Sequence, residues 1–267
     1  YDSIMEHLKD LNIVITAAAS GIGAEMAKTL IKNGSNVMVC DKDEIALERI
    51  KNDCPGILSM KIDVSKEEDV IKFFSEVESQ FGNMNALINN AGIAGPSVKL
   101  EDIDTKAWEE TIKINLTGTF MCSKAAIPLI KKSGGGSIIN IGSSSSFLGT
   151  PLRSAYTASK WGLVGLTKTW AMEYGQDKIR TNVICPTSVS GDRIEGVIQR
   201  DAEYRETTPE KIREAYLSQN SLRTFVESDE IVGMVIYLLS PLAKNISGQM
   251  LVIDGHTETL AMPKFDE

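Results

Sequence analysis

Short apolar runs alternate with longer amphipathic stretches along the whole chain, and this alternation limits the possible folds more than any other feature. Seven runs have the length and composition of strands: NIVIT (12–16), NVMVC (36–40), LSMKI (58–62), ALIN (86–89), SIINI (137–141), TNVIC (181–185) and MLVID (250–254). Strands separated by helices in this way form βαβ units, which build a parallel sheet with helices on both faces. The sequence therefore predicts one doubly wound α/β domain over residues 1–267.

Two of the amphipathic stretches carry helix boundary signals. The stretch 24–34 ends on Gly34, and the stretch 65–82 begins at Ser65, a predicted N-cap, and ends on Gly82. The polar segment 187–223 interrupts the rhythm and predicts one or two short helices. Because open α/β sheets bind ligands at the carboxyl ends of their strands, we expect this segment to form a lid over a substrate there.

Composition excludes several classes of function. With 42% hydrophobic and 24% charged residues the chain is a folded globular protein, and its net charge of −8 argues against a nucleic-acid partner. The four cysteines lack metal-ligand spacing, so we expect no metal site and reduced thiols in the cytoplasm. No run of about 18 apolar residues predicts a membrane span. The charged first ten residues do not match a signal peptide.

The stretch ITAAASGIG (15–23) follows the first predicted strand and opens the first helix. Gly21 and Gly23 allow a pyrophosphate to approach free N–H groups at the helix N-terminus. Asp41 ends the second strand, 18 residues beyond Gly23, where a carboxylate accepts hydrogen bonds from the adenosine ribose. Such a carboxylate repels a 2′-phosphate, so NAD is favoured over NADP. The alternatives are a tight turn without a ligand and, for Asp41, a helix cap.

Tyr156 and Lys160 are four residues apart in a predicted helix, so their side chains lie on one face. A neighbouring ammonium lowers the pKa of a phenol, and the phenol can then exchange a proton with an alcohol or carbonyl oxygen. A solvated helix face is the simpler interpretation of this pair alone.

Several further motifs occur in one order: TAAASGIG (16–23), DV (63–64), NNAG (89–92), KIN ending at Asn115, Ser143 thirteen residues before Tyr156, YTASK (156–160) and SGQMLVIDG (247–255). With these motifs the chain resembles the short-chain dehydrogenase/reductases of the ordinary, non-extended type from Ile13 to about Gly255. The resemblance implies a Rossmann fold, a nicotinamide cofactor and a homo-oligomer, either tetramer or dimer.

The resemblance also implies roles for individual residues. Tyr156 is the expected general acid and base, Ser143 orients the substrate oxygen, Lys160 holds the nicotinamide ribose, and Asn115 supports a water that relays protons to Lys160. Expected cofactor contacts are Thr16, Ser20, Gly21, Ile22, Gly23, Asp41, Asp63, Val64, Asn90, Ala91, Gly92, Tyr156, Lys160, Pro186 and Val189.

The sequence departs from the family pattern at two places. Ala17 replaces the first glycine of the phosphate loop, which is tolerated if its φ is negative. Thr187 and Gly191 stand where the family has a glycine and a cofactor-binding threonine. Ser188 or Ser190 is then expected to supply the missing hydroxyl, and Val189 its backbone groups.

The substrate is the least defined part of the prediction. Arg193 is expected to pair with an acidic or polyhydroxylated substrate, with Ser145 as a further contact, although a solvated helix face also explains the lid arginines. The leading hypothesis is an NAD-dependent oxidoreductase acting on a small polyol, sugar or hydroxy acid. The alternatives are an NADPH-dependent ketone reductase and a catalytically silent dinucleotide-binding sensor or scaffold. A Ser-His-Asp hydrolase is excluded, because the chain lacks a G-x-S-x-G elbow and has only His7 and His256.

Overall fold

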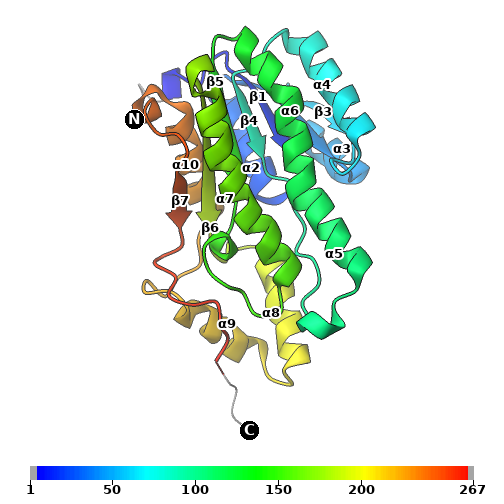
Figure 1. The fold of residues 1–267 in the computed structure, drawn as a ribbon, viewed down its shortest axis with the longest axis vertical. Coiled ribbons are helices and arrows are strands. Elements are labelled where there is room, and N and C mark those ends of the chain that lie inside the picture. The colour runs from blue at the N-terminus through cyan, green and yellow to red at the C-terminus, as the bar shows by residue number, and fades with distance from the viewer. Residues whose placement is uncertain (1–4, 264–267) are drawn as a thin grey trace.

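The computed structural model describes residues 5–263, and within them seven strands form one parallel sheet (Figure 1). The strand order is β3-β2-β1-β4-β5-β6-β7, and all neighbouring strands run parallel. The strands are β1 (Asn12–Thr16), β2 (Asn36–Asp41), β3 (Leu58–Lys61), β4 (Ala86–Asn89), β5 (Gly136–Ile141), β6 (Ile179–Pro186) and β7 (Met250–Ile253). The predicted doubly wound α/β fold is confirmed. The strand order reverses between β1 and β4, which is where such sheets open a crevice for a ligand.

Helices cover both faces of the sheet, as predicted (Figure 1). One face shares a core with α2 (Gly21–Lys32), α3 (Glu44–Asp53) and α10 (Ser228–Leu239). The other shares a core with α4 (Glu67–Phe81) and α6 (Gly118–Lys132), and α5 (Thr105–Ile112) and α7 (Ser154–Tyr174) lie against each other beside them. Between residues 5 and 263, no helix combines the length and the apolar character needed to cross a bilayer.

The boundary residues of two helices test the predicted signals. Gly34 follows the end of α2 with φ +86, and Gly82 caps α4 with φ +73, so both glycine stops are confirmed. The predicted N-cap at Ser65 is wrong. The backbone N–H of Ser65 donates to the carboxylate of Asp63 at 2.9 Å and Lys66 is the N-cap, because this short turn delays the helix until Glu67.

Segment 187–223 contains two helices, α8 (Asp192–Tyr204) and α9 (Pro209–Ser218), which lie beyond the carboxyl ends of β6 and β7 (Figure 1). They join through a small apolar cluster of Ile194, Ile198, Ala202 and Ile212. The segment after β7 passes along α9, where the N–H of Glu258 donates to the carbonyl of Gln219 at 2.9 Å. Residues from the chain's end therefore lie against the lid helices.

Candidate active site

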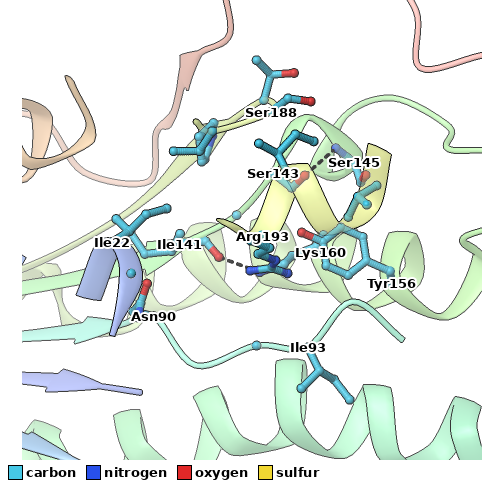
Figure 2. Close-up of a pocket in the computed structure, with 18 of the residues that line it drawn as sticks. Ile22, Asn90, Ile93, Ile141, Ser143, Ser145, Tyr156, Lys160, Ser188 and Arg193 are labelled. Atoms are coloured by element: carbon cyan, nitrogen blue, oxygen red, sulfur yellow. Dashed lines mark hydrogen bonds between the residues drawn. The ribbon is translucent and has the colours of Figure 1, made fainter. Parts of the chain in front are cut away.

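A cavity of about 810 Å³ lies at the carboxyl edge of the sheet and runs from the loop after β1 to the lid helices (Figure 2). Most of the predicted site residues line it: Ser20, Gly21, Ile22, Asp41, Asp63, Val64, Asn90, Ala91, Gly92, Ser143, Ser145, Tyr156, Lys160, Pro186, Val189 and Arg193. Segments far apart in the sequence thus converge on one space because every parallel strand delivers its following loop to the same edge.

Three predicted site residues stand behind the cavity wall. The hydroxyl of Thr16 accepts the backbone N–H groups of Asn90 and Ala91, each at 3.1 Å. At Gly23 an added Cβ would lie 2.6 Å from the side-chain nitrogen of Asn90, so only glycine allows this close packing. Asn115 is fully buried. These three residues support the wall rather than form it.

The phosphate loop leaves room for a ligand at Gly21 but is strained at Ala17. Gly21 has φ +56, and a Cβ there would meet nothing within 4 Å, so the backbone faces open space at the N-terminus of α2. Ala17 has φ +50, which is the left-handed conformation and not the negative φ under which alanine was expected to be tolerated. The side chain of Asn90 donates to the Ala17 carbonyl at 2.9 Å and holds this turn.

Asp41 is fixed at the end of β2 with its carboxylate on the cavity wall. One of its oxygens accepts the N–H of Ala19 at 3.2 Å and the other accepts the N–H of Asp43 at 3.1 Å. The cap of α3 is Asp43, which accepts the N–H of Ala46 at 3.0 Å. The alternative interpretation of Asp41 as a helix cap is therefore wrong, and the loop and Asp41 together suit a ribose and a pyrophosphate.

Tyr156 and Lys160 lie on one face of α7, as predicted, with the ammonium 5.5 Å from the centre of the phenol ring. The ammonium also donates to the carbonyl of Ile141 at 2.8 Å. Burial raises the pKa of Tyr156, but the charges of Lys160 and Arg193 and a hydrogen bond from Ser143 outweigh it, so this pKa lies below its usual value. Burial lowers the pKa of Lys160. The solvated-face interpretation is wrong, because Lys160 is only 5% exposed.

The four serines have different surroundings. Ser143 caps a short 3₁₀ turn: its hydroxyl oxygen accepts the N–H of Ser145 at 3.2 Å, and its own N–H donates to the hydroxyl of Ser146 at 3.1 Å. Accepting that N–H leaves the Ser143 proton free to be donated toward Tyr156 or a substrate oxygen. The hydroxyl of Ser145 is paired with Thr150 at 2.7 Å.

Asn115 lies in a π-helical turn, Lys113–Thr117, between α5 and α6. Its side-chain oxygen accepts the N–H of Ile93 at 2.8 Å, and its side-chain nitrogen donates to the Ile93 carbonyl at 3.0 Å and to Ser159 at 3.1 Å. An added Cβ on Gly92 would lie 3.4 Å from that oxygen and 3.6 Å from the Lys160 ammonium. The π turn, a feature often found at functional sites, thus brings Asn115 close to Lys160.

The loop after β6 is tied to the chain that follows α9. Val189 and Val226 form a parallel bridge, in which Ser190 donates to the Val226 carbonyl and Val226 donates to that of Ser188, both at 2.9 Å. This pattern turns the N–H and carbonyl of Val189 away from the bridge. The hydroxyl of Ser190 donates to Glu227 at 2.7 Å, whereas Ser188 lines the cavity (Figure 2). Of the two candidate serines, Ser188 is the one available to a ligand.

Sequence reasoning missed several residues of the cavity wall. The guanidinium of Arg153 lies 4.8 Å from the centre of the Tyr156 ring and donates to the carbonyl of Ala94 at 3.0 Å. Its position one helical turn before Tyr156 was the available signal. The pair of Tyr216 and Asp201 and the side chains of Leu260 and Met262 also line the cavity.

Possible metal ligands do not gather in the part of the chain between residues 5 and 263, where no three His, Cys, Asp or Glu side chains are suitably grouped. The four cysteines there, Cys40, Cys54, Cys122 and Cys185, are free and buried.

A doubly wound sheet with Ser, Tyr and Lys at its carboxyl edge, beside a glycine-containing loop, defines a class of α/β oxidoreductases. The family model described as short chain dehydrogenase matches residues 11–201. The chain therefore belongs to the short-chain dehydrogenase/reductase family, and it is an oxidoreductase of that family.

Curated and solved relatives cover nearly the whole chain. The chain is 34% identical to D-beta-hydroxybutyrate dehydrogenase of Rhizobium meliloti, over 91% of this chain and 96% of the relative. It is 35% identical to trans-4-hydroxycyclohexanecarboxylate dehydrogenase of Sinomonas cyclohexanicum, over 91% and 90%. Among solved structures, NAD⁺-bound xylitol dehydrogenase matches with a TM-score of 0.86 and 27% identity, over 92% of this chain and 98% of that one.

Proposed function

We propose that this protein is an NAD-dependent dehydrogenase that interconverts a secondary alcohol and its ketone. The observation that carries the proposal is the surroundings of Tyr156, which has Lys160, Arg193 and Ser143 beside it in the cavity that begins at the phosphate loop. Tuned acids and bases at the carboxyl edge of such a sheet are what a hydride-transfer reaction needs from the protein.

The residues divide the chemistry between them. A bound nicotinamide supplies the hydride acceptor or donor at its C4 atom. Ser143 donates a hydrogen bond to the substrate oxygen and orients it. In the oxidation direction the Tyr156 phenolate accepts the hydroxyl proton as the hydride leaves the carbon, and in reduction Tyr156 returns that proton. Lys160 stabilises the phenolate, and Asn115 supports the proton path behind it.

NAD is the cofactor that the adenosine end of the cavity favours. The Asp41 carboxylate lines the wall, held by the N–H groups of Ala19 and Asp43, and would accept hydrogen bonds from ribose hydroxyls while repelling a 2′-phosphate. The open space at Gly21 suits a pyrophosphate at the N-terminus of α2. Comparing kcat/KM with NAD and NADP tests this assignment, since an NADPH-linked reductase would prefer NADP.

A hydroxy acid is the substrate class that the lid favours. Within residues 5–263 no carboxylate forms an ion pair with Arg193, although this cation lines the cavity near Tyr156. A cation without a counter-ion in a cavity suits an anionic ligand. Both curated relatives named above act on alcohols that carry a carboxylate.

The deciding experiment is a screen of NAD reduction over polyols, hydroxy acids and neutral secondary alcohols, followed by two variants. Tyr156→Phe should lower kcat by about 10²- to 10⁴-fold while NADH binding is retained. A binding module without catalysis would show NADH binding and no turnover in either form. Arg193→Ala should raise KM for the hydroxy acid far more than for a neutral alcohol, and equal effects on both would contradict its role.

A cytoplasmic homo-oligomer, either tetramer or dimer, is the expected assembly. Three large apolar side chains on α6 and α7 are exposed in the single chain: Phe120, Trp161 and Met172. A neighbouring group of exposed apolar residues on long helices is typical of a surface that a second subunit covers.

A further inference from the structure

Helix α8 presents a regular row of side chains to the cavity. Arg193, Val197, Asp201 and Arg205 all line it, and they are spaced four residues apart. Residues at this spacing lie on one helix face, and each step advances about 6 Å along the helix axis. The cavity therefore extends away from Tyr156 along α8, with a cation first and an apolar side chain one turn later.

The C-terminal segment supplies apolar side chains to the same cavity. Leu260 and Met262 line it, and Met262 also packs against the apolar cluster of α8 and α9. Its sulfur accepts a hydrogen bond from the side chain of Gln219 at 3.4 Å. Asn220 and Thr257 form an antiparallel bridge that fixes the start of this segment on the loop after α9. Hydrogen bonds and packing thus hold these two side chains in place.

A satisfied polar pair follows the apolar section. The hydroxyl of Tyr216 donates to the Asp201 carboxylate at 2.8 Å, so neither group requires a ligand to complete its hydrogen bonding. Between Arg193 and this pair, the side chains that α8 and the C-terminal segment turn to the cavity are Val197, Leu260 and Met262. That section suits hydrocarbon.

We propose that Val197, Leu260 and Met262 form a specificity site for the apolar body of the substrate, with its anionic group at Arg193. The inference rests on the proposed function and refines it: the substrate is a compact hydroxy acid with a cyclic or branched hydrocarbon body, and Met262 determines its size. The family model ends at residue 201, so Leu260 and Met262 belong to the part of the chain that differs from the shared catalytic core.

The test is calorimetric binding of three probes, with and without saturating NADH: acetate, cyclohexanecarboxylate and neutral cyclohexanone. Wild type should bind cyclohexanecarboxylate more tightly than acetate. Met262→Ala should weaken cyclohexanecarboxylate and cyclohexanone by about tenfold and acetate by less than about twofold, since only the ring contacts this wall. Leu260→Ala should act in the same direction. Leu242→Ala, which removes an exposed leucine outside the cavity, is the matched control and should change nothing.

The outcomes separate this inference from the function on which it rests. Unchanged cyclohexanone affinity in Met262→Ala, no cyclohexanone binding to wild type, or equal weakening of all three probes would overturn the apolar site. Arg193→Met should abolish acetate binding and leave cyclohexanone unaffected. If wild type binds cyclohexanone but not acetate, the anionic substrate fails while the apolar site stands. If NADH itself does not bind, the dehydrogenase proposal fails.

Discussion

Replacing Ala17 with glycine should stabilise the protein, although Ala→Gly changes usually destabilise. The φ of +50 at Ala17 costs an alanine about 1–2 kcal/mol, and glycine is free of this cost. Glycine also gives the unfolded chain more freedom, which removes about 0.4–1 kcal/mol of stability. The difference favours Ala17→Gly by about 0.8 kcal/mol, or a rise in Tm of about 2 °C for a chain of this size.

Thermal unfolding followed by circular dichroism measures this difference directly. Ala125→Gly is the matched control: Ala125 lies inside α6 with ordinary helical backbone, so the same chemical change there should lower stability by about 1 kcal/mol. The strain argument is refuted if Ala17→Gly lowers Tm as the control does. NADH titration of both variants adds a second readout, because relief of strain next to Gly21 should leave cofactor affinity equal or tighter.

Three further predictions concern the catalytic pair, the cofactor and the assembly. Alcohol oxidation needs deprotonated Tyr156, so kcat falls as the pH drops below that pKa; Lys160→Met removes the charge that lowers it, and the falling limb of the pH profile should move to higher pH. Asp41→Ser should raise kcat/KM with NADP and lower it with NAD, and an unchanged ratio would remove Asp41 from cofactor selection. Trp161→Glu should give smaller particles by light scattering, whereas wild type is an oligomer at the same concentration.

The sequence predicted the sheet well because its signals are local. Every buried strand is a short apolar run, and the two glycine stops need only a positive φ at Gly34 and Gly82. Ser65 shows where local reasoning fails. A serine before three acidic residues is typical of an N-cap, but Asp63 accepts its N–H first, and competition between two side chains for one turn is not visible in a residue pattern.

Much of the site was predictable for a related reason. Ser143, Tyr156 and Lys160 lie within 18 residues, joined by one turn and one helix, so their spacing fixes much of their geometry. The fate of the loop hydroxyls was not predictable. Ser188 and Ser190 are equivalent in the sequence, and only the bridge to Val226 and the carboxylate of Glu227, nearly 40 residues away, distinguishes them.

The far wall of the cavity depends on two segments that meet only in the folded chain. Arg193 and Val197 face one way because four residues span slightly more than one helical turn, and Met262 meets them across about 60 residues of intervening sequence. One residue inserted after Arg193 would rotate the rest of α8 by about 100° and turn Val197 and Asp201 off the cavity. It would leave Tyr156 and Lys160 untouched on α7. Substrate choice and hydride chemistry are therefore mechanically separable in this fold, and the lid can change what is bound without disturbing how the proton moves.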